Sequence, residues 1–140
     1  MRIVPDNVIL NKSAIIERAL KRMREEYAAN PALNDLTHID AMILNIERAC
    51  QAAIDMAQHI VAVQHLGMPQ TSADAFILLE RNKIISLQCA RNMVSMTGFR
   101  NIAIHEYQEL DMAVVRALAE TRYTSLIDYC REIGTRIVVE

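Results

Sequence analysis

The sequence predicts an all-α protein, an up-down bundle of about four to five helices that forms a single domain over residues 1–140. Hydrophobic residues make up 52% of the chain but aromatic residues only 4%, so the core must be built from aliphatic side chains, as in helix bundles. Only three Gly and three Pro occur, which is too few for the turns of an all-β fold. Apolar residues instead recur every three to four positions, as they do along amphipathic helices.

The first two expected helices are long. Apolar spacing predicts the first over about residues 6–29, and Asn30-Pro31 ends it. The second is expected over about residues 37–66, with Thr37 as its N-terminal cap. A helix of about 30 residues is roughly 45 Å long, so its apolar stripe must pack along partners within the chain or in a second chain. That stripe is narrow and comprises Ile39, Ile43, Ile46, Cys50, Ala53, Ala57, Ile60 and Gln64.

Three further helices are expected. The segment 71–74 has the residues of a helix start and predicts a short helix over about residues 73–80. Another follows over about residues 83–96, before Thr97-Gly98-Phe99, which we interpret as a stop signal. The last is expected over about residues 109–134. Its inner side should comprise Val114, Ala117, Leu118, Thr121, Leu126, Cys130 and Ile133, and an extended tail should follow over residues 136–140.

Charge and cysteine content exclude several classes of protein. The net charge is −2 and the pI about 6.1, so RNA contact is expected only through a local patch. The three cysteines are far apart and form no CxxC pair, which argues against a zinc site or a disulfide framework and favours reduced, buried thiols. No signal peptide and no apolar run of membrane length are found. We therefore expect a cytoplasmic protein with no membrane partner, no metal and no cofactor.

The chemistry is concentrated in one segment, residues 100–107. Arg100 supplies a permanent, fork-shaped cation that suits a phosphate group. His105 supplies a proton donor or acceptor near neutral pH, and Tyr107 a hydroxyl that can be modified. Asn101 can support them by hydrogen bonding to phosphate or by orienting the histidine. The segment has the groups that a phosphoryl-transfer site requires.

The spacing of these residues raises a geometric problem. On a regular helix five residues advance by about 500°, so Arg100 and His105 lie about 140° apart around the axis. Arg100 and Tyr107 are about 700° apart and share nearly one face. Two solutions remain open: an irregular segment near Gly98, or a two-fold dimer in which a second copy completes the site.

An Arg/His pair suits the cleavage of RNA. Arg100 can hold a phosphate and stabilise the charge that grows in the transition state. His105 can deprotonate a ribose 2′-hydroxyl or protonate the leaving 5′-oxygen. Because the nucleophile belongs to the RNA itself, the chemistry requires no metal and excludes DNA as a substrate.

The motif Arg100-Asn101-Ile102-Ala103-Ile104-His105-Glu106-Tyr107 resembles that of HepT-like proteins in the HEPN superfamily. Ile46-Glu47-Arg48 in the long helix and the segment 71–76 extend the resemblance to about residues 3–136. The resemblance implies a HEPN-type bundle that works as a homodimer with the motif at the interface. It also implies a toxin of a toxin–antitoxin pair, a metal-independent RNA endonuclease. Its antitoxin would be a minimal nucleotidyltransferase, MntA-like, which transfers AMP to the motif tyrosine.

Carried onto this chain, the resemblance makes Arg100 and His105 the catalytic pair and Tyr107 the modified residue. Asn101 matches the polar residue that often follows the arginine. Two alternatives remain. One is a non-catalytic helical binding module or scaffold for a companion nucleotidyltransferase. The other is a structural helical dimer with no chemistry, in which His105→Ala would change neither RNA processing nor toxicity.

Overall fold

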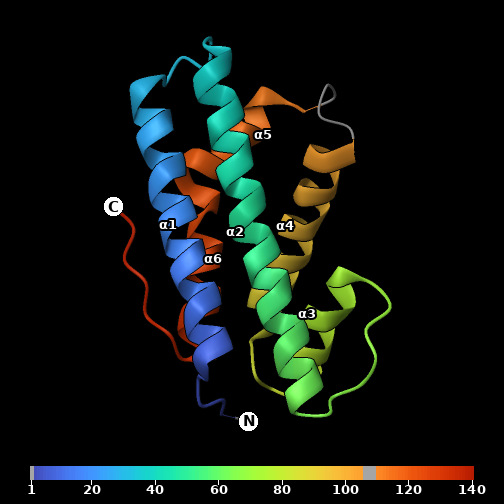
Figure 1. The fold of residues 1–140 in the computed structure, drawn as a ribbon. Coiled ribbons are helices and arrows are strands. Elements are labelled where there is room, and N and C mark those ends of the chain that lie inside the picture. Colours follow the sequence, from blue (N-terminus) through green and yellow to red (C-terminus); the bar gives the residue numbers. More distant parts are fainter. Residues whose placement is uncertain (1, 106–109) are drawn as a thin grey trace.

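A computed structural model describes residues 2–105 and 110–140, and of His105 it describes the backbone alone. Figure 1 shows long helices that run up and down beside one another, and no strand is present in the described ranges. This confirms the predicted all-α, up-down bundle. The helices are α1 (Asn7–Ala29), α2 (Leu36–Val63), α3 (Ser72–Arg81), α4 (Leu87–His105), α5 (Met112–Ala117) and α6 (Thr124–Ile133), with a π-helical turn, η2 (Leu118–Arg122), between the last two.

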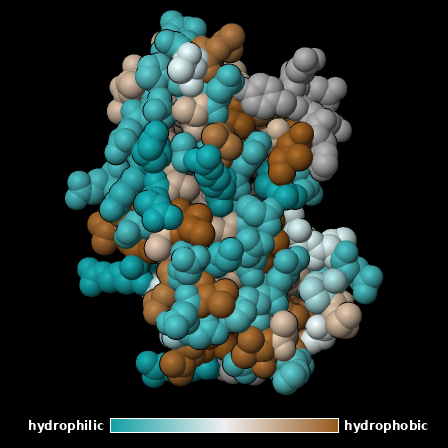
Figure 2. All heavy atoms as spheres, in the orientation of Figure 1, coloured by the Kyte–Doolittle hydropathy of each residue, from teal (hydrophilic) through white to brown (hydrophobic). Residues whose placement is uncertain are grey.

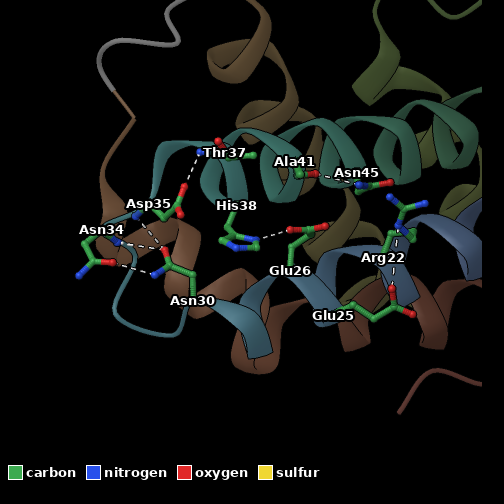
Figure 3. A network of polar contacts seen from close by, with 10 residues as sticks. All are labelled: Arg22, Glu25, Glu26, Asn30, Asn34, Asp35, Thr37, His38, Ala41 and Asn45. Atoms are coloured by element: carbon green, nitrogen blue, oxygen red, sulfur yellow. Dashed lines mark hydrogen bonds and ion pairs between the residues drawn. The ribbon is translucent and has the colours of Figure 1, made fainter.

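The turn between α1 and α2 is built from amide and carboxylate side chains, which Figure 3 shows at close range. Asn30 Oδ1 accepts from the backbone N–H groups of Asn34 and Asp35 at 3.1 and 3.0 Å. Asp35 then caps α2, since its carboxylate accepts from the N–H of Thr37 at 2.9 Å. The prediction that Thr37 is the cap was therefore wrong, because the carboxylate two residues earlier takes that place.

The long helix α2 lies at the centre of the bundle and packs against α1, α3, α4 and α6. The prediction of a narrow apolar stripe on it was wrong. Residues such as Met42, Ala49, Ile54 and Met56 are buried as well as the predicted ones, so α2 is enclosed on several sides. Gln64, placed on the stripe, lies just beyond the helix and is exposed. The wider burial follows from the central position of α2, since each neighbouring helix covers a different side of it.

The core is aliphatic, as predicted, with one aromatic pair at its centre. Tyr129 of α6 is fully buried and its ring meets that of Phe76 edge to face, with 5.5 Å between centroids. Its hydroxyl donates to the carbonyl of Ala53 at 3.1 Å, which satisfies the buried O–H. Burial also holds the pKa of Tyr129 well above its usual range. The pair ties α6 to α2 and α3.

The helix α4 begins later and ends later than predicted. Residues before Leu87 form a turn in which Lys83 has a φ of +59°. The predicted stop at Gly98 was wrong, because α4 continues to His105. Phe99 and Ala103 are buried beyond the glycine, and this packing outweighs the roughly 1 kcal/mol that a mid-helix glycine costs.

The last predicted helix is divided by the π-turn. In its N-terminal half Leu118 is buried as predicted, and Val115 and Ala119 are buried as well. Val114 and Ala117 are exposed, so the prediction was wrong at these two positions. Thr121 is exposed too. The later positions Leu126, Cys130 and Ile133 are buried as predicted. A π-turn adds a residue to one turn of the helix, so a single helical period does not fit both halves.

The tail and the surface complete the fold. The C-terminal segment runs back beside α1 (Figure 1), where Ile137 is buried and the N–H of Val138 donates to Glu17 Oε2 at 2.8 Å. The face drawn in Figure 2 is largely hydrophilic over α1 and α2, with hydrophobic side chains in small patches. Within the described residues, no helix is both long and apolar enough to cross a membrane.

Candidate active site

The C-terminal part of α4 holds the first residues of the predicted motif. Phe99 and Ala103 turn into the core, whereas Asn101, Ile102 and Ile104 are exposed. Arg100 lies between these two faces and is half-buried against α2. Arg100 therefore lies at the α2–α4 junction, where one side of its guanidinium contacts α2.

Two hydrogen bonds hold the guanidinium of Arg100. Its Nη2 donates to Gln51 Oε1 on α2 at 2.5 Å, and its Nη1 donates to Asn101 Oδ1 at 3.1 Å. Its Nε is buried and has no hydrogen-bond partner among the residues that the structure describes. A buried donor without a partner costs about 1–3 kcal/mol. Such a donor calls for an explanation, and a catalytic role is one of the known ones.

Two further α2 groups lie within electrostatic reach of Arg100. Burial raises the pKa of the Glu47 carboxyl, and the nearby Arg100 cation opposes that shift. Burial also raises the pKa of the Cys50 thiol to about 12, again against the influence of Arg100. Cys50 is thus a neutral thiol at physiological pH and is no nucleophile. The cation is flanked by a carboxyl group and by apolar surface.

A polar chain on α2 extends away from Arg100. Gln51 Nε2 donates to Asp55 Oδ1 at 2.8 Å, and Asp55 Oδ2 pairs with Lys12 Nζ of α1 at 3.2 Å. None of these three residues was predicted to belong to the site. The spacing of Glu47, Gln51 and Asp55, each one helical turn from the next, was the signal that could have found them.

The structure brings together some of the predicted site residues and leaves the others open. Asn101 Oδ1 accepts a hydrogen bond from Arg100 Nη1, whereas its predicted contacts with phosphate or with the histidine stay predictions. The backbone is helical through His105, which removes the first geometric solution, an irregular segment near Gly98. The side chain of His105 and all of Tyr107 lie outside the described residues. Their predicted roles therefore stay predictions.

An apolar groove lies beside the motif, between α4 and the α5–η2 segment. It has a volume of about 280 Å³ and is lined by residues such as Phe99, Val114 and Arg122. On the same helix, a Cβ atom added at Gly98 would meet nothing within 4 Å. No described residue of this chain therefore packs against the space that a side chain at position 98 would occupy. As for metal ligands, the described residues contain no cluster of three or more His, Cys, Asp or Glu suited to an ion.

Comparison with known proteins decides the family. The sequence model of the family described as ribonuclease HepT-like matches residues 13–133, which is most of the chain. The chain belongs to the ribonuclease HepT-like family. One relative is the "mRNA nuclease HepT" of Shewanella oneidensis, 43% identical over 111 residues that cover 79% of this chain and 84% of the relative. Another is the "tRNA nuclease HepT" of Aphanizomenon flos-aquae, 36% identical over 93 residues that cover 63% of this chain and 60% of the relative.

Solved structures of HepT-like proteins have the same fold. A tri-AMPylated Shewanella oneidensis HEPN toxin in complex with MNT antitoxin superposes with a TM-score of 0.87 at 38% identity, covering 92% of this chain and 98% of that one. A toxin–antitoxin structure with AMP-PNP also gives 0.87, at 37% identity and with 91% and 98% coverage. The HEPN-type bundle predicted from the motif is thereby confirmed.

Proposed function

We propose that this HepT-like chain is a single-domain toxin of a toxin–antitoxin pair and acts in the cytoplasm as a metal-independent RNA endonuclease. Arg100 and His105 are its catalytic pair, and Asn101 supports the arginine. The observation that carries the proposal is the state of Arg100, a half-buried guanidinium held by two amide oxygens in a HepT-like motif. The names of the relatives, an mRNA nuclease and a tRNA nuclease, support RNA as the substrate.

Arg100 binds the phosphate that is cut. Gln51 and Asn101 each accept one Nη hydrogen, and the remaining Nη hydrogens are available to two phosphate oxygens. This paired contact strengthens as charge builds on the phosphorus oxygens, so it lowers the barrier rather than only binding substrate.

His105 moves the protons. As a general base it takes the proton of the ribose 2′-hydroxyl, whose oxygen attacks the adjacent phosphorus. The bond from phosphorus to the 5′-oxygen breaks, and that oxygen receives a proton from a histidine acting as acid. The products are a 2′,3′-cyclic phosphate and a 5′-hydroxyl, so no water, metal or cofactor enters this step.

A homodimer completes the site. Because α4 is helical through His105, positions 100 and 105 of one chain lie about 140° apart around the axis. A two-fold partner that packs on α4 would bring a second arginine and histidine into the same cleft. The open position of Gly98 and the apolar groove beside it support α4 as the contact, since a glycine allows two helices to approach closely.

An MntA-like nucleotidyltransferase antitoxin silences the toxin by transferring AMP to Tyr107. The tri-AMPylated relative in complex with its MNT antitoxin supports this step. Each AMP group adds a phosphodiester charge close in sequence to Arg100. That charge would occupy the cation meant for RNA phosphate and would block the cleft sterically.

The test of cleavage uses purified protein in EDTA, after mass spectrometry has confirmed that Tyr107 carries no AMP. We expect the wild type to cut cellular RNA and to leave 2′,3′-cyclic phosphate ends. His105→Ala should lower the rate by about 10²–10⁴-fold, the usual contribution of general acid–base catalysis. If clean wild-type protein cuts no cellular RNA, the binding module becomes the better explanation.

The dimer is tested at Gly98. Gly98→Leu should produce monomers in light scattering and lose cleavage, because its side chain would fill the space that the partner helix needs. Gly98→Ala is the matched control and should raise the unfolding free energy of the monomer by up to about 1 kcal/mol. A Gly98→Leu protein that remains a dimer would place the interface elsewhere.

The modification is tested by comparing the same protein with and without AMP on Tyr107. We expect the modified protein to lose cleavage and to regain it when a phosphodiesterase removes the AMP. Tyr107→Phe should cleave RNA but resist the antitoxin. Equal cleavage by the two forms would show that the modification does not act by blocking Arg100.

A further inference from the structure

Gln51 lies on α2 at the point where α4 brings in Arg100. Its Oε1 accepts from Arg100 Nη2 at 2.5 Å, although the two residues are 49 positions apart in sequence. Its Nε2 donates to Asp55 Oδ1 at 2.8 Å, one turn further along α2. Both ends of this amide are therefore engaged by charged groups.

Asp55 decides which end of the amide faces Arg100. A carboxylate only accepts hydrogen bonds, so the NH₂ group of Gln51 must face Asp55 and its carbonyl oxygen is left for the arginine. Asp55 is in turn held by Lys12 of α1, with Nζ 3.2 Å from Oδ2. Every link from Lys12 to Arg100 joins a donor to an acceptor. The orientation of the Gln51 amide is therefore fixed by Asp55 and Lys12, which lie outside the site.

We infer that Gln51 is a positioning residue, which holds the guanidinium of Arg100 for the RNA phosphate with an orientation set by Asp55 and Lys12. The inference rests on the proposed RNA cleavage. Asn101, the other acceptor, is the next residue of α4 and moves with it, whereas Gln51 anchors the arginine to a second helix. A neutral acceptor also leaves the positive charge of Arg100 free for phosphate, which a carboxylate at this place would not do.

The first test measures the hold on Arg100 directly. Nitrogen-15 spectra of protein labelled at arginine report how fast the Nη groups rotate, and the Arg100 signal is assigned by its loss in Arg100→Lys. We expect slow rotation in the wild type and fast rotation in Gln51→Met, which has a similar length but no acceptor. Gln58→Met, an exposed glutamine on the same helix, is the matched control and should leave the rotation slow.

The second test measures RNA cleavage by the same proteins. Gln51→Met should lose about 10–100-fold in kcat/KM, as expected when a catalytic group is misplaced, while Gln58→Met stays at the wild-type value. Gln51→Glu loses the hydrogen bond to Asp55, since two carboxylates cannot share one, but it keeps an acceptor for Arg100. It should therefore keep the rotation slow but lose about tenfold, mainly through a higher KM, because its charge competes with phosphate for Arg100. Gln51→Met thus tests whether the arginine must be held, and Gln51→Glu tests whether the acceptor must be neutral.

Two results would overturn the inference: slow rotation that persists in Gln51→Met, or freed rotation with cleavage at the wild-type rate. If the wild type itself does not cleave RNA, the proposed function fails as a whole. The spectra would then still show whether Gln51 anchors Arg100, independently of any activity.

Discussion

Arg24 and Arg100 are both half-buried arginines that join two parts of the bundle, but their donors are used in different ways. Arg24 of α1 donates to the carbonyl of Ala119 at 2.8 Å and to that of Glu140 at 3.5 Å, and its guanidinium lies 4.9 Å from the centre of the Tyr123 ring. Its Nε and one Nη are thus committed to the π-turn and the tail. Arg100 keeps a buried Nε without a partner in the described chain and bonds only to side-chain amides.

The difference separates a structural arginine from a functional one. Hydrogen bonds to backbone carbonyls and a cation–π contact stabilise the fold at the α1–η2 junction. At the α2–α4 junction, amide acceptors hold the cation without neutralising it, and part of its donor capacity stays unused. We therefore expect changes at Arg24 to act on stability and changes at Arg100 to act on RNA cleavage.

Among conservative changes at the two arginines, Arg100→Lys should have the largest effect on cleavage. The charge is retained, but an ammonium group is a point donor and cannot be held by two amides while it offers a fork to phosphate. We expect the rate of RNA cleavage to fall by about 10²-fold, comparable to the loss of an oxyanion donor. Arg91→Lys on the exposed face of α4 is the control and should stay near wild type. If Arg100→Lys cleaves RNA at a rate within a few fold of wild type, then a guanidinium that donates two hydrogen bonds to phosphate is not required.

Arg24→Met should have the opposite pattern. Loss of the charged hydrogen bond to Ala119 and of the Tyr123 contact should lower the unfolding free energy by about 2 kcal/mol in urea titrations. Cleavage per folded molecule should not change. Arg18→Met, on the exposed side of α1, should alter neither quantity. Reduced cleavage by fully folded Arg24→Met would contradict a purely structural role for Arg24.

A smaller effect is expected at the start of α1, which belongs to the structural side of the comparison. Hydrogen bonds from His59 and from the N–H of Ile9 lower the pKa of Asp6. The carboxylate therefore contributes stability above its unfolded pKa of about 3.9, and this contribution is lost as the pH falls through the lower folded value. Thermal melts from pH 6 to 3 should fall more steeply for wild type than for Asp6→Asn. Parallel curves would contradict the assignment.

The smallest effect is expected at Cys50, beside the functional arginine. Burial raises its pKa to about 12, so only about one molecule in 10⁴ carries the thiolate at pH 8. Iodoacetamide should leave Cys50 of the folded protein unlabelled and cleavage unchanged, whereas urea should expose all three thiols. Rapid labelling with loss of activity would mean that the Arg100 cation controls this thiol after all.

The architecture could be predicted from the sequence because the signals for helix formation are local. Apolar spacing found α1, and Thr71 with Asp74 forms the capping box that marks α3. Gly98 was misinterpreted because buried contacts of Phe99 and Ala103 outweigh the low helix propensity of one glycine. Val114, Ala117 and Thr121 were wrongly expected on the inner side of the last helix because a π-turn carries no reliable sequence signal.

The site was predictable only in part. The spacing of Arg100, His105 and Tyr107 is a local pattern, so the motif could be found in the sequence. The acceptor on the second helix could not, since Gln51 is 49 residues from Arg100 and meets it only because α2 and α4 pack together. A glutamine on the half-buried face of a long helix is also compatible with many ordinary surface roles.

The most direct test of the central claim is Arg100→Met, with RNA cleavage in EDTA and unfolding by urea measured on one AMP-free preparation. Two hydrogen bonds worth about 1 kcal/mol each are lost, but a buried donor without a partner is removed as well. We predict cleavage at the level of the buffer alone and an unfolding free energy within about 1 kcal/mol of wild type. Cleavage at the wild-type rate by this folded variant would contradict the account.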